Sequence, residues 1–202
     1  EEFDWQAQER ELNAFHQFRA ALDGVHIHFV HERARRGHGI PLILIHGWPS
    51  TFAELLPLVP FLTDPHAHGI DGPGFDVVIP SLPGYGFSER PRQVGVNYQY
   101  VAELWHRLMR GLGYERYGAQ GGDSGAGIAT FMALNNPGRM IGVHLSNLEI
   151  TPYTGPGALP LSAAERTYRE RNEEFWQTEF GYKAIQSTKP QTLGYGLNDS
   201  PA

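Results

Sequence analysis

Residues 121–125 read Gly-Gly-Asp-Ser-Gly and place two candidate nucleophiles, Asp123 and Ser124, between glycines. Carboxylate and hydroxyl groups both form covalent intermediates in enzymes. A sharp turn from a strand into a helix needs small residues two positions before and after its tip, because larger side chains would collide with neighbouring backbone. Such a turn exposes the tip side chain. It also leaves the next N–H group at a helix N-terminus, where that group stabilises developing negative charge.

The spacing leaves the tip of this turn open. With Asp123 at the tip, Gly121 and Gly125 are the small flanking residues. With Ser124 at the tip, the segment reads G-x-S-x-A, as in esterases. A third interpretation is the Gly-Asp-Ser-Gly run of chymotrypsin-like proteases, but these have an all-β fold, and the alternation of strands and helices in this sequence argues against it. A fourth interpretation is a glycine-rich helix start at which either side chain is the cap.

Residues 46–49, His-Gly-Trp-Pro, follow the apolar run 41–45 directly. Ligands bind at the carboxyl ends of strands in open α/β sheets, so a loop there is placed to aim a backbone N–H at a site. Pro49 restricts this loop and permits a cis Trp48–Pro49 bond. A plain strand-to-helix turn is the alternative interpretation. We interpret His46 as a residue that shapes the loop rather than as a base.

The positions of the histidines argue against a base or a metal centre within this chain. In hydrolases with a strand-to-helix nucleophile turn, the base follows the nucleophile, and His144 alone follows residue 123, inside the next predicted strand. The pairs 26/28 and 66/68 have no set of carboxylates at ligand spacing, and the chain has no cysteine. We therefore expect no visible base, no metal site and no cofactor.

The elements that must position these segments alternate between strands and helices. Strands are predicted at 41–45, 75–79, 117–120 and 141–145. The run 41–45 is wholly apolar, which is typical of a strand buried on both faces, and 141–145 is also interpreted as a buried strand. Helical segments separate the strands at 52–62, 98–112 and 126–135. This order predicts an α/β layer with a mostly parallel sheet. Upstream, Asp23-Gly24 joins two alternating segments, 18–22 and 25–31, and predicts a β-hairpin with a type I′ turn.

The composition divides the chain into three parts. Residues 1–16 are polar and helix-tolerant, 17–149 form the predicted α/β core, and 150–202 read as the start of a lid or cap region. In the last part a stretch rich in Pro, Gly and Thr precedes a charged helix, at which Ser162 and Glu165 predict a capping box. Tyr182 lies in this region, where a phenol above a cleft can donate a hydrogen bond to a leaving oxygen.

Charge and hydropathy exclude several classes of protein. The net charge of −6 over 202 residues, without basic blocks, argues against binding to nucleic acid or to an anionic membrane. The longest apolar run, residues 40–45, is too short to cross a bilayer, and no basic and apolar leader opens the chain. The sequence thus predicts a cytoplasmic location. The absence of Cys excludes a disulfide scaffold and a thiolate site.

Taken together, the motifs identify a family resemblance. The chain resembles the microsomal-type epoxide hydrolases, a branch of the α/β-hydrolase superfamily that includes the juvenile-hormone epoxide hydrolases. The segments that carry the resemblance are Phe3-Asp4-Trp5, His46-Gly47-Trp48-Pro49, residues 80–88, Gln120-Gly121-Gly122-Asp123, Gly181-Tyr182 and residues 185–190.

The resemblance implies roles for particular residues. It implies Asp123 as the nucleophile, the backbone N–H groups of Trp48 and Ser124 as the oxyanion hole, and Tyr182 as the proton donor from the lid. Ser124 departs from the family, whose members usually carry Trp or another apolar residue there. The residues expected to shape the site are His46, Gly47, Pro49, Gly121, Gly122 and Gly125.

The implied fold is an α/β-hydrolase fold with the start of a helical lid, incomplete at both ends. The implied reaction opens a small hydrophobic epoxide with water to a vicinal diol through an alkyl ester of Asp123. Alternatives are a haloalkane dehalogenase, against which Ser124 argues, an esterase that uses Ser124, and a catalytically incomplete or non-enzymatic chain. Since the chain starts at Glu1 and ends at Ala202, we expect it to be a portion of a longer enzyme. This portion lacks the second lid tyrosine, the acid and the histidine base.

Overall fold

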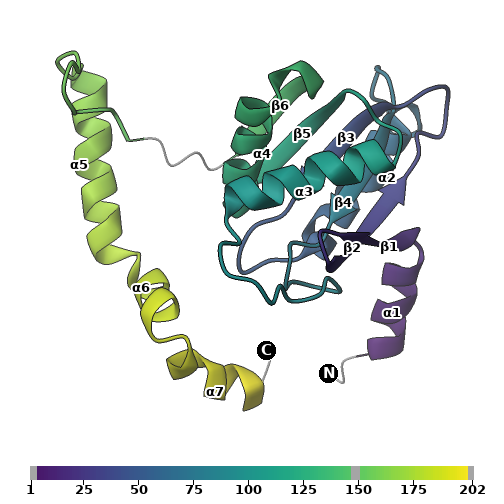
Figure 1. Cartoon of the computed structure of the whole chain (residues 1–202), viewed down its shortest axis with the longest axis horizontal. Helices are drawn as coiled ribbons and strands as arrows, with labels where there is room; N and C mark the ends of the chain where they lie inside the picture. Colours follow the sequence, from purple (N-terminus) through teal and green to yellow (C-terminus); the bar gives the residue numbers. More distant parts are fainter. Residues whose placement is uncertain (1–3, 147–150, 200–202) are drawn as a thin grey trace. The chain divides into compact units, whose positions relative to one another are not determined.

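In the computed structural model, which describes residues 4–146 and 151–199, the chain forms two compact units, Glu1–Leu148 and Glu149–Ala202. The N-terminal unit contains the sheet with its covering helices, and the C-terminal unit contains helices α5, α6 and α7 (Figure 1).

The described residues of the N-terminal unit form a six-stranded sheet with the order β1-β2-β4-β3-β5-β6. β2 pairs antiparallel with β1 on one side and with β4 on the other, whereas β4, β3, β5 and β6 run parallel to one another. The sheet confirms the predicted α/β layer. The strands are β1 (Gln17–Leu22), β2 (Val25–Glu32), β3 (Ile40–Ile45), β4 (Phe75–Pro80), β5 (Tyr117–Gly122) and β6 (Met140–Ser146).

The first two strands form the hairpin that the sequence predicts. Asp23 and Gly24 connect them with φ angles of 52° and 77°, so both turn residues have the positive φ that a type I′ turn requires. The register pairs Leu22 with Val25 directly next to the turn.

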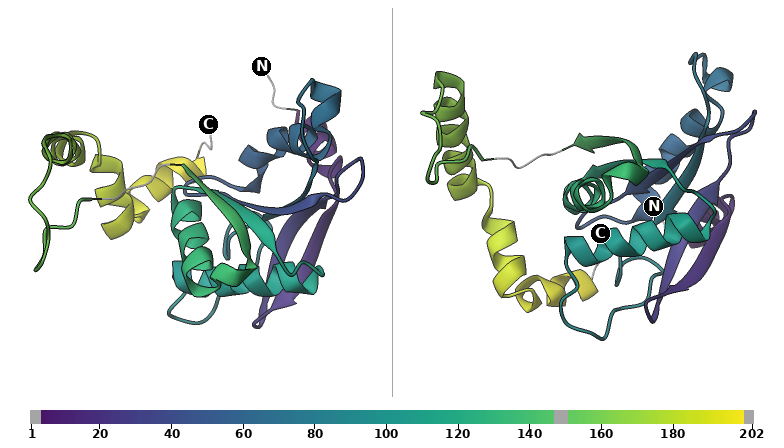
Figure 2. Two further views of the ribbon diagram at one scale, coloured as in Figure 1. Left: turned by 90° about the horizontal axis from the view of Figure 1, so that it is seen from above. Right: turned by 45° about the horizontal axis from the view of Figure 1, so that its top comes forward.

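Helices cover both faces of the sheet (Figure 2). Apolar side chains of α3 (Tyr98–Gly111) and α4 (Ser124–Asn135) share one core with one face of the sheet. The 3₁₀ segment η1 (Phe52–Leu58) and the short helix α2 (Val59–Thr63) pack on the other face, and residues from the end of α1 (Trp5–Asn13) join them. Two further 3₁₀ segments are η2 (Pro65–His68) and η3 (Pro137–Arg139).

The central strand β3 shows why its sequence is apolar at consecutive positions. Ile43 and Ile45 lie in the core beneath α3 and α4, and Leu44 between them lies in the opposite core. Because side chains of a strand alternate between faces, a strand covered on both faces needs apolar residues throughout. Burial on both sides fixes the position of the loop that follows Ile45.

The predicted burial of residues 141–145 is wrong. These residues form β6, whose side chains are mostly exposed, with Ile141 51% and Val143 40% accessible. Within the described residues β6 pairs only with β5, so it lies at the edge of the sheet. Apolar composition alone does not distinguish an edge strand from a central one.

The start of β4 contains a buried carboxylate. Asp76 is 7% exposed and accepts hydrogen bonds from the Arg33 guanidinium at 2.8 Å, the Ala34 N–H at 2.9 Å and the Tyr114 hydroxyl at 2.8 Å. The Tyr114 hydroxyl also lies 2.9 Å from Nε2 of His31. This network connects β2, β4 and the segment before β5 through one side chain.

The C-terminal unit consists of α5 (Ala163–Thr178), α6 (Gly181–Thr188) and α7 (Gln191–Asp199). Both hydrogen bonds of the predicted capping box are present between Ser162 and Glu165. Between α5 and α6, the ring of Phe180 stacks on Trp176 with 3.9 Å between centroids. Among the described residues, none of the helices combines the length and the apolar character that crossing a bilayer requires.

Candidate functional site

The turn between β5 and α4 is the sharp strand-to-helix bend that the glycines predict. β5 ends at Gly122 and α4 begins at Ser124, so Asp123 alone connects them. Asp123 has φ 51° and ψ −124°, a conformation that residues with a side chain rarely adopt. The sequence left open whether Asp123 or Ser124 is at the tip of the turn. In the structure the tip is Asp123, and Ser124 is the first residue of the helix.

Glycines make room for this turn. A Cβ atom on Gly121 would collide with the carbonyl group of Gly125, and a Cβ on Gly125 would collide with the carbonyl of Ile45. A Cβ on Gly47 would lie 2.6 Å from Cβ of Asp123. The first two obstacles are backbone atoms, which cannot rotate away, so these positions require glycine for the chain to approach so closely. A Cβ on Gly122 would lie 2.8 Å from the hydroxyl oxygen of the Ser146 side chain.

One oxygen of the Asp123 side chain receives a converging set of donors. Oδ1 accepts the Trp48 N–H at 3.0 Å and the Ser124 N–H at 2.5 Å. The Ser124 hydroxyl donates to the same oxygen at 2.9 Å. The two backbone donors follow β3 and β5, which are neighbours in the sheet, so the carboxyl ends of parallel strands place them together.

His46 holds the loop that provides the Trp48 donor. Its imidazole is almost fully buried, and its Nε2 accepts the Leu82 N–H at 3.1 Å. Nδ1 therefore carries the proton and donates to the carbonyl oxygen of Gly47 at 2.9 Å. That carbonyl and the Trp48 N–H belong to the same peptide group, so the imidazole fixes the direction of this donor.

Burial lowers the pKa of His46, which favours its neutral form, and both ring nitrogens have partners within the loop region. A neutral ring is consistent with one nitrogen that donates and one that accepts. The peptide bond between Trp48 and Pro49 is cis.

Two tyrosines that the sequence did not indicate as site residues lie at the turn. The Tyr98 hydroxyl, from the first residue of α3, donates to the Ser124 hydroxyl at 3.3 Å. The Tyr85 ring lies 5.7 Å from the His46 ring. Burial raises the pKa of Tyr85, with smaller contributions from Tyr98 and the negative charge of Asp123. No local pattern marks Tyr98, which the chain separates from Ser124 by 26 positions.

Tyr182 belongs to the C-terminal unit, where its exposed ring lies 5.9 Å from that of Phe180. Its predicted position above Asp123 remains a prediction.

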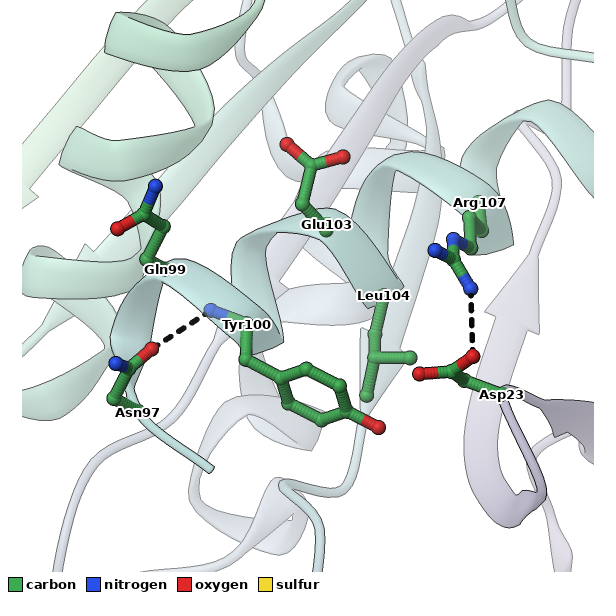
Figure 3. A pocket seen from close by; sticks show the side chains of 7 residues that line it. All are labelled: Asp23, Asn97, Gln99, Tyr100, Glu103, Leu104 and Arg107. Carbon is green, nitrogen blue, oxygen red and sulfur yellow. Dashed lines mark hydrogen bonds and ion pairs between the residues drawn. The ribbon is translucent and has the colours of Figure 1, made fainter. Parts of the chain in front are cut away.

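A pocket of about 330 Å³ lies at a different place, beside the first turns of α3 (Figure 3). Two of its three charged side chains are paired, since Arg107 lies 3.1 Å from Asp23. Asp123 is not among its lining residues, so this pocket is separate from the turn. Within the described residues, no group of three or more His, Asp or Glu side chains is placed to hold a metal ion.

Comparison with known families agrees with this arrangement. A family model described as alpha/beta hydrolase fold matches residues 40–192, which include β3, the turn at Asp123 and most of the C-terminal unit. A second model, described as epoxide hydrolase N terminus, matches residues 1–55.

Individual relatives are similar over nearly the whole chain. Epoxide hydrolase 1 of Oryctolagus cuniculus is 37% identical over 223 residues, which cover 99% of this chain and 48% of the relative. The structure of the Aspergillus niger epoxide hydrolase superposes with a TM-score of 0.79 at 34% identity, over 99% of this chain and 52% of that one. The juvenile hormone epoxide hydrolase of the silkworm Bombyx mori gives a TM-score of 0.79 at 31% identity, over 100% and 50% of the two chains.

The chain thus spans about half the length of the curated relatives it matches. These findings confirm the resemblance that the sequence motifs indicated, including the juvenile-hormone branch.

Proposed function

The chain belongs to the α/β-hydrolase family, and on that premise we propose that the protein is an epoxide hydrolase that converts an epoxide and water into a vicinal diol. The observation that carries the proposal is the position of Asp123 at a strained turn, where one carboxylate oxygen lies between two backbone N–H donors. The epoxide hydrolase names of the relatives support it further.

In the first step, Oδ2 of Asp123 attacks a carbon atom of the epoxide ring. A C–O bond to Oδ2 forms while the bond between that carbon and the ring oxygen breaks, and the ring oxygen takes the electron pair. The Tyr182 hydroxyl donates the proton that this oxygen needs. The product is an alkyl ester of Asp123 that carries a neighbouring hydroxyl group.

In the second step, a water molecule attacks Cγ of the ester and loses one proton to a base. Negative charge develops on Oδ1, where the N–H groups of Trp48 and Ser124 already point. The tetrahedral intermediate then expels the diol oxygen, which takes the proton back from the base. The carboxylic acid that remains loses its proton, which returns to the Tyr182 oxygen, and the carboxylate forms again. A carboxylate suits this chemistry because its ester can be hydrolysed, whereas the ether that a serine would form cannot.

The structure disfavours an esterase that uses Ser124. Its hydroxyl proton is directed at Asp123 Oδ1, and Ser124 occupies the first turn of α4 rather than the tip of the bend. A haloalkane dehalogenase needs N–H side chains that bind the halide, commonly a Trp directly after the nucleophile. Ser124 has no such group, so the epoxide is the substrate class that these residues fit best.

The test is an isotope experiment on the protein at its natural full length. Enzyme in excess reacts with styrene oxide for a single turnover in H₂¹⁸O, and mass spectrometry follows the label in both the diol and the Asp123 peptide. The proposed steps give an unlabelled diol, because its new oxygen comes from Oδ2, and one ¹⁸O atom in Asp123. Label in the diol with none in the peptide would show direct attack by water and would exclude the ester.

A further inference from the structure

The Ser124 side chain does more than the family pattern assigns to this position. The family implies only the backbone N–H of this residue as a donor, but here the hydroxyl also donates to Oδ1 of Asp123 at 2.9 Å. Ser124 therefore makes two hydrogen bonds to the same oxygen, one from the main chain and one from the side chain.

The direction of these hydrogen bonds follows from a count of protons. A serine hydroxyl has one proton to donate and two lone pairs to accept with. Since the proton of Ser124 points at a carboxylate oxygen, the Tyr98 hydroxyl at 3.3 Å must be the donor to the Ser124 oxygen. Tyr98, Ser124 and Asp123 thus form a short relay in which each hydroxyl polarises the next group.

Contacts within the N-terminal unit hold Tyr98 in place. Its ring lies over Gly127 on α4, where a Cβ atom would come within 2.5 Å of the ring. Asn97 caps the start of α3 by accepting the Tyr100 N–H at 2.9 Å, which fixes the backbone on either side of Tyr98. Glycine at position 127 allows the hydroxyl of Tyr98 to reach Ser124.

Three donors on one oxygen suit the tetrahedral intermediate better than the resting carboxylate. A carboxylate oxygen offers about two lone-pair directions, whereas an sp³ oxyanion offers about three. The Trp48 N–H, the Ser124 N–H and the Ser124 hydroxyl supply three donors to Oδ1. Only interactions that strengthen on the way to the transition state accelerate a step.

We propose that the Ser124 hydroxyl, positioned by Tyr98, is a third donor of the oxyanion hole and acts on the hydrolysis of the ester. This inference rests on the proposed function, because it needs Asp123 to be the nucleophile. It has opposite consequences for the two steps. Charge on Oδ1 decreases when the ester forms and increases when water attacks, so the hydroxyl slows the first step slightly and speeds the second.

The experiment measures the two steps separately in the protein at its natural full length. Rapid quench with styrene oxide and intact-mass analysis give the rate of ester formation and the rate of ester decay. In Ser124→Ala, which keeps the backbone N–H, we expect ester decay to slow by about 10- to 100-fold. Ester formation should be equal to or faster than in the wild type, so the ester should accumulate.

Thr130→Val is the matched control. It also removes a hydroxyl from α4, but this hydroxyl donates to the Ala126 carbonyl at 2.8 Å and not to the turn at Asp123. Both rates should remain at the wild-type values in this variant. A slower decay of the ester in Thr130→Val, equal to that in Ser124→Ala, would overturn the proposal, because the effect would then belong to the helix.

Tyr98→Phe tests the positioning role and keeps the ring over Gly127. We expect ester decay to slow by about 3-fold, with ester formation and KM unchanged. In the Ser124→Ala background the same substitution should have no further effect, because the hydroxyl that Tyr98 orients is absent. Full additivity of the two substitutions would overturn the relay.

The results separate the failure of this inference from that of the proposed function. If wild-type protein forms no ester on Asp123, both fail together. If the ester forms and decays at the same rate in wild type and in Ser124→Ala, only the third donor is excluded. If Ser124→Ala does not fold, Tyr98→Phe decides alone, and equal rates of ester decay in Tyr98→Phe and wild type would overturn the proposal.

Discussion

Two aspartates at opposite ends of the same sheet illustrate different uses of one side chain. Asp76 is the second residue of β4, at the amino end of that strand, and it is buried. Asp123 follows β5 at the carboxyl end and is exposed. The strands that carry them lie on either side of β3 and run parallel to it.

The two carboxylates differ in where their hydrogen bonds come from. Asp76 accepts on both oxygens, with Ala34 N–H on Oδ1 and the Arg33 and Tyr114 side chains on Oδ2. Burial alone would raise the pKa of Asp76, but the bonds from Ala34, Tyr114 and Arg33 outweigh it and hold the pKa below 3.8. The side chain therefore remains ionised and connects parts of the fold.

At Asp123 the hydrogen bonds described above converge on Oδ1, and the backbone is in an unfavourable conformation. Strain of this kind persists only where surrounding structure enforces it, and it is concentrated at functional sites. The difference indicates that Asp76 serves stability and Asp123 serves chemistry.

The largest expected effect is that of Asp123→Asn on activity. The amide is a poor nucleophile, so diol formation should fall by roughly 10⁴-fold or more. Unfolding by urea, followed by circular dichroism, should give a free energy within about 1 kcal/mol of the wild type, since an exposed residue contributes little to the fold. A loss of several kcal/mol in stability would show that Asp123 is a structural residue and would remove the contrast with Asp76.

Asp76→Ala should have the opposite effects, with a large loss of stability and little change in activity. The substitution leaves the Ala34 N–H and the Tyr114 hydroxyl without their acceptor and the Arg33 guanidinium without its partner. We expect the free energy of unfolding to fall by about 3 kcal/mol. At a temperature where the variant is folded, kcat should remain within about 2-fold of the wild type, because the network lies at the other end of the sheet. A kcat that falls as far as in Asp123→Asn would contradict the division of roles.

Much of this architecture follows from local sequence. The alternation of short apolar runs with helical segments predicts the order from β3 to β6, and Asp23-Gly24 predicts the hairpin. Such signals are local because periodicity and turn conformation depend on neighbouring residues. Exposure of β6 depends on what pairs with it and what covers it, which composition does not encode.

The site is predictable to a smaller extent. The glycines around Asp123 indicate a sharp turn, but two registers satisfy the need for small flanking residues. The family resemblance implies Asp123, and the φ angle of Asp123 shows that this residue is at the tip. The contact of Tyr98 with Ser124 joins residues from different helices, so no spacing along the chain reveals it. The same is true of Leu82, whose N–H sets the tautomer of His46.

A smaller expected effect is a difference between the two ends of the sheet in how their contribution to stability changes with acid. His28 is buried, and burial, with a smaller contribution from Arg19, lowers its pKa to about 4 from 6.5. Its Nε2 lies 2.8 Å from the Gln17 side-chain oxygen, and its Nδ1 lies 2.9 Å from the Ser81 hydroxyl. Ser81 precedes Leu82, whose N–H binds His46, so His28 supports the end of the sheet that carries the turn.

The sign of the pH dependence follows from these values. The unfolded chain binds a proton at His28 below about pH 6.5, whereas the folded protein binds it only near pH 4. The contribution of His28 to stability is therefore complete above pH 6.5 and is lost as the pH falls toward 4. Between pH 7 and pH 5 this amounts to about 2 kcal/mol, from about 1.4 kcal/mol for each unit of pKa.

Urea unfolding at several pH values between 7 and 5 measures this contribution, and His28→Asn is the variant to compare. Burial also lowers the pKa values of His31, His46 and His106, so the wild type loses stability by more than the share of His28. The variant should lose about 2 kcal/mol less than the wild type over this range. Asp76→Ala should not reduce the wild-type slope. The pKa of Asp76 lies below its ordinary value, so its own contribution disappears only in stronger acid, and loss of its negative charge, which raises the pKa of His31, lowers the His31 pKa further. Equal slopes for wild type and His28→Asn would show that His28 does not couple this end of the sheet to pH.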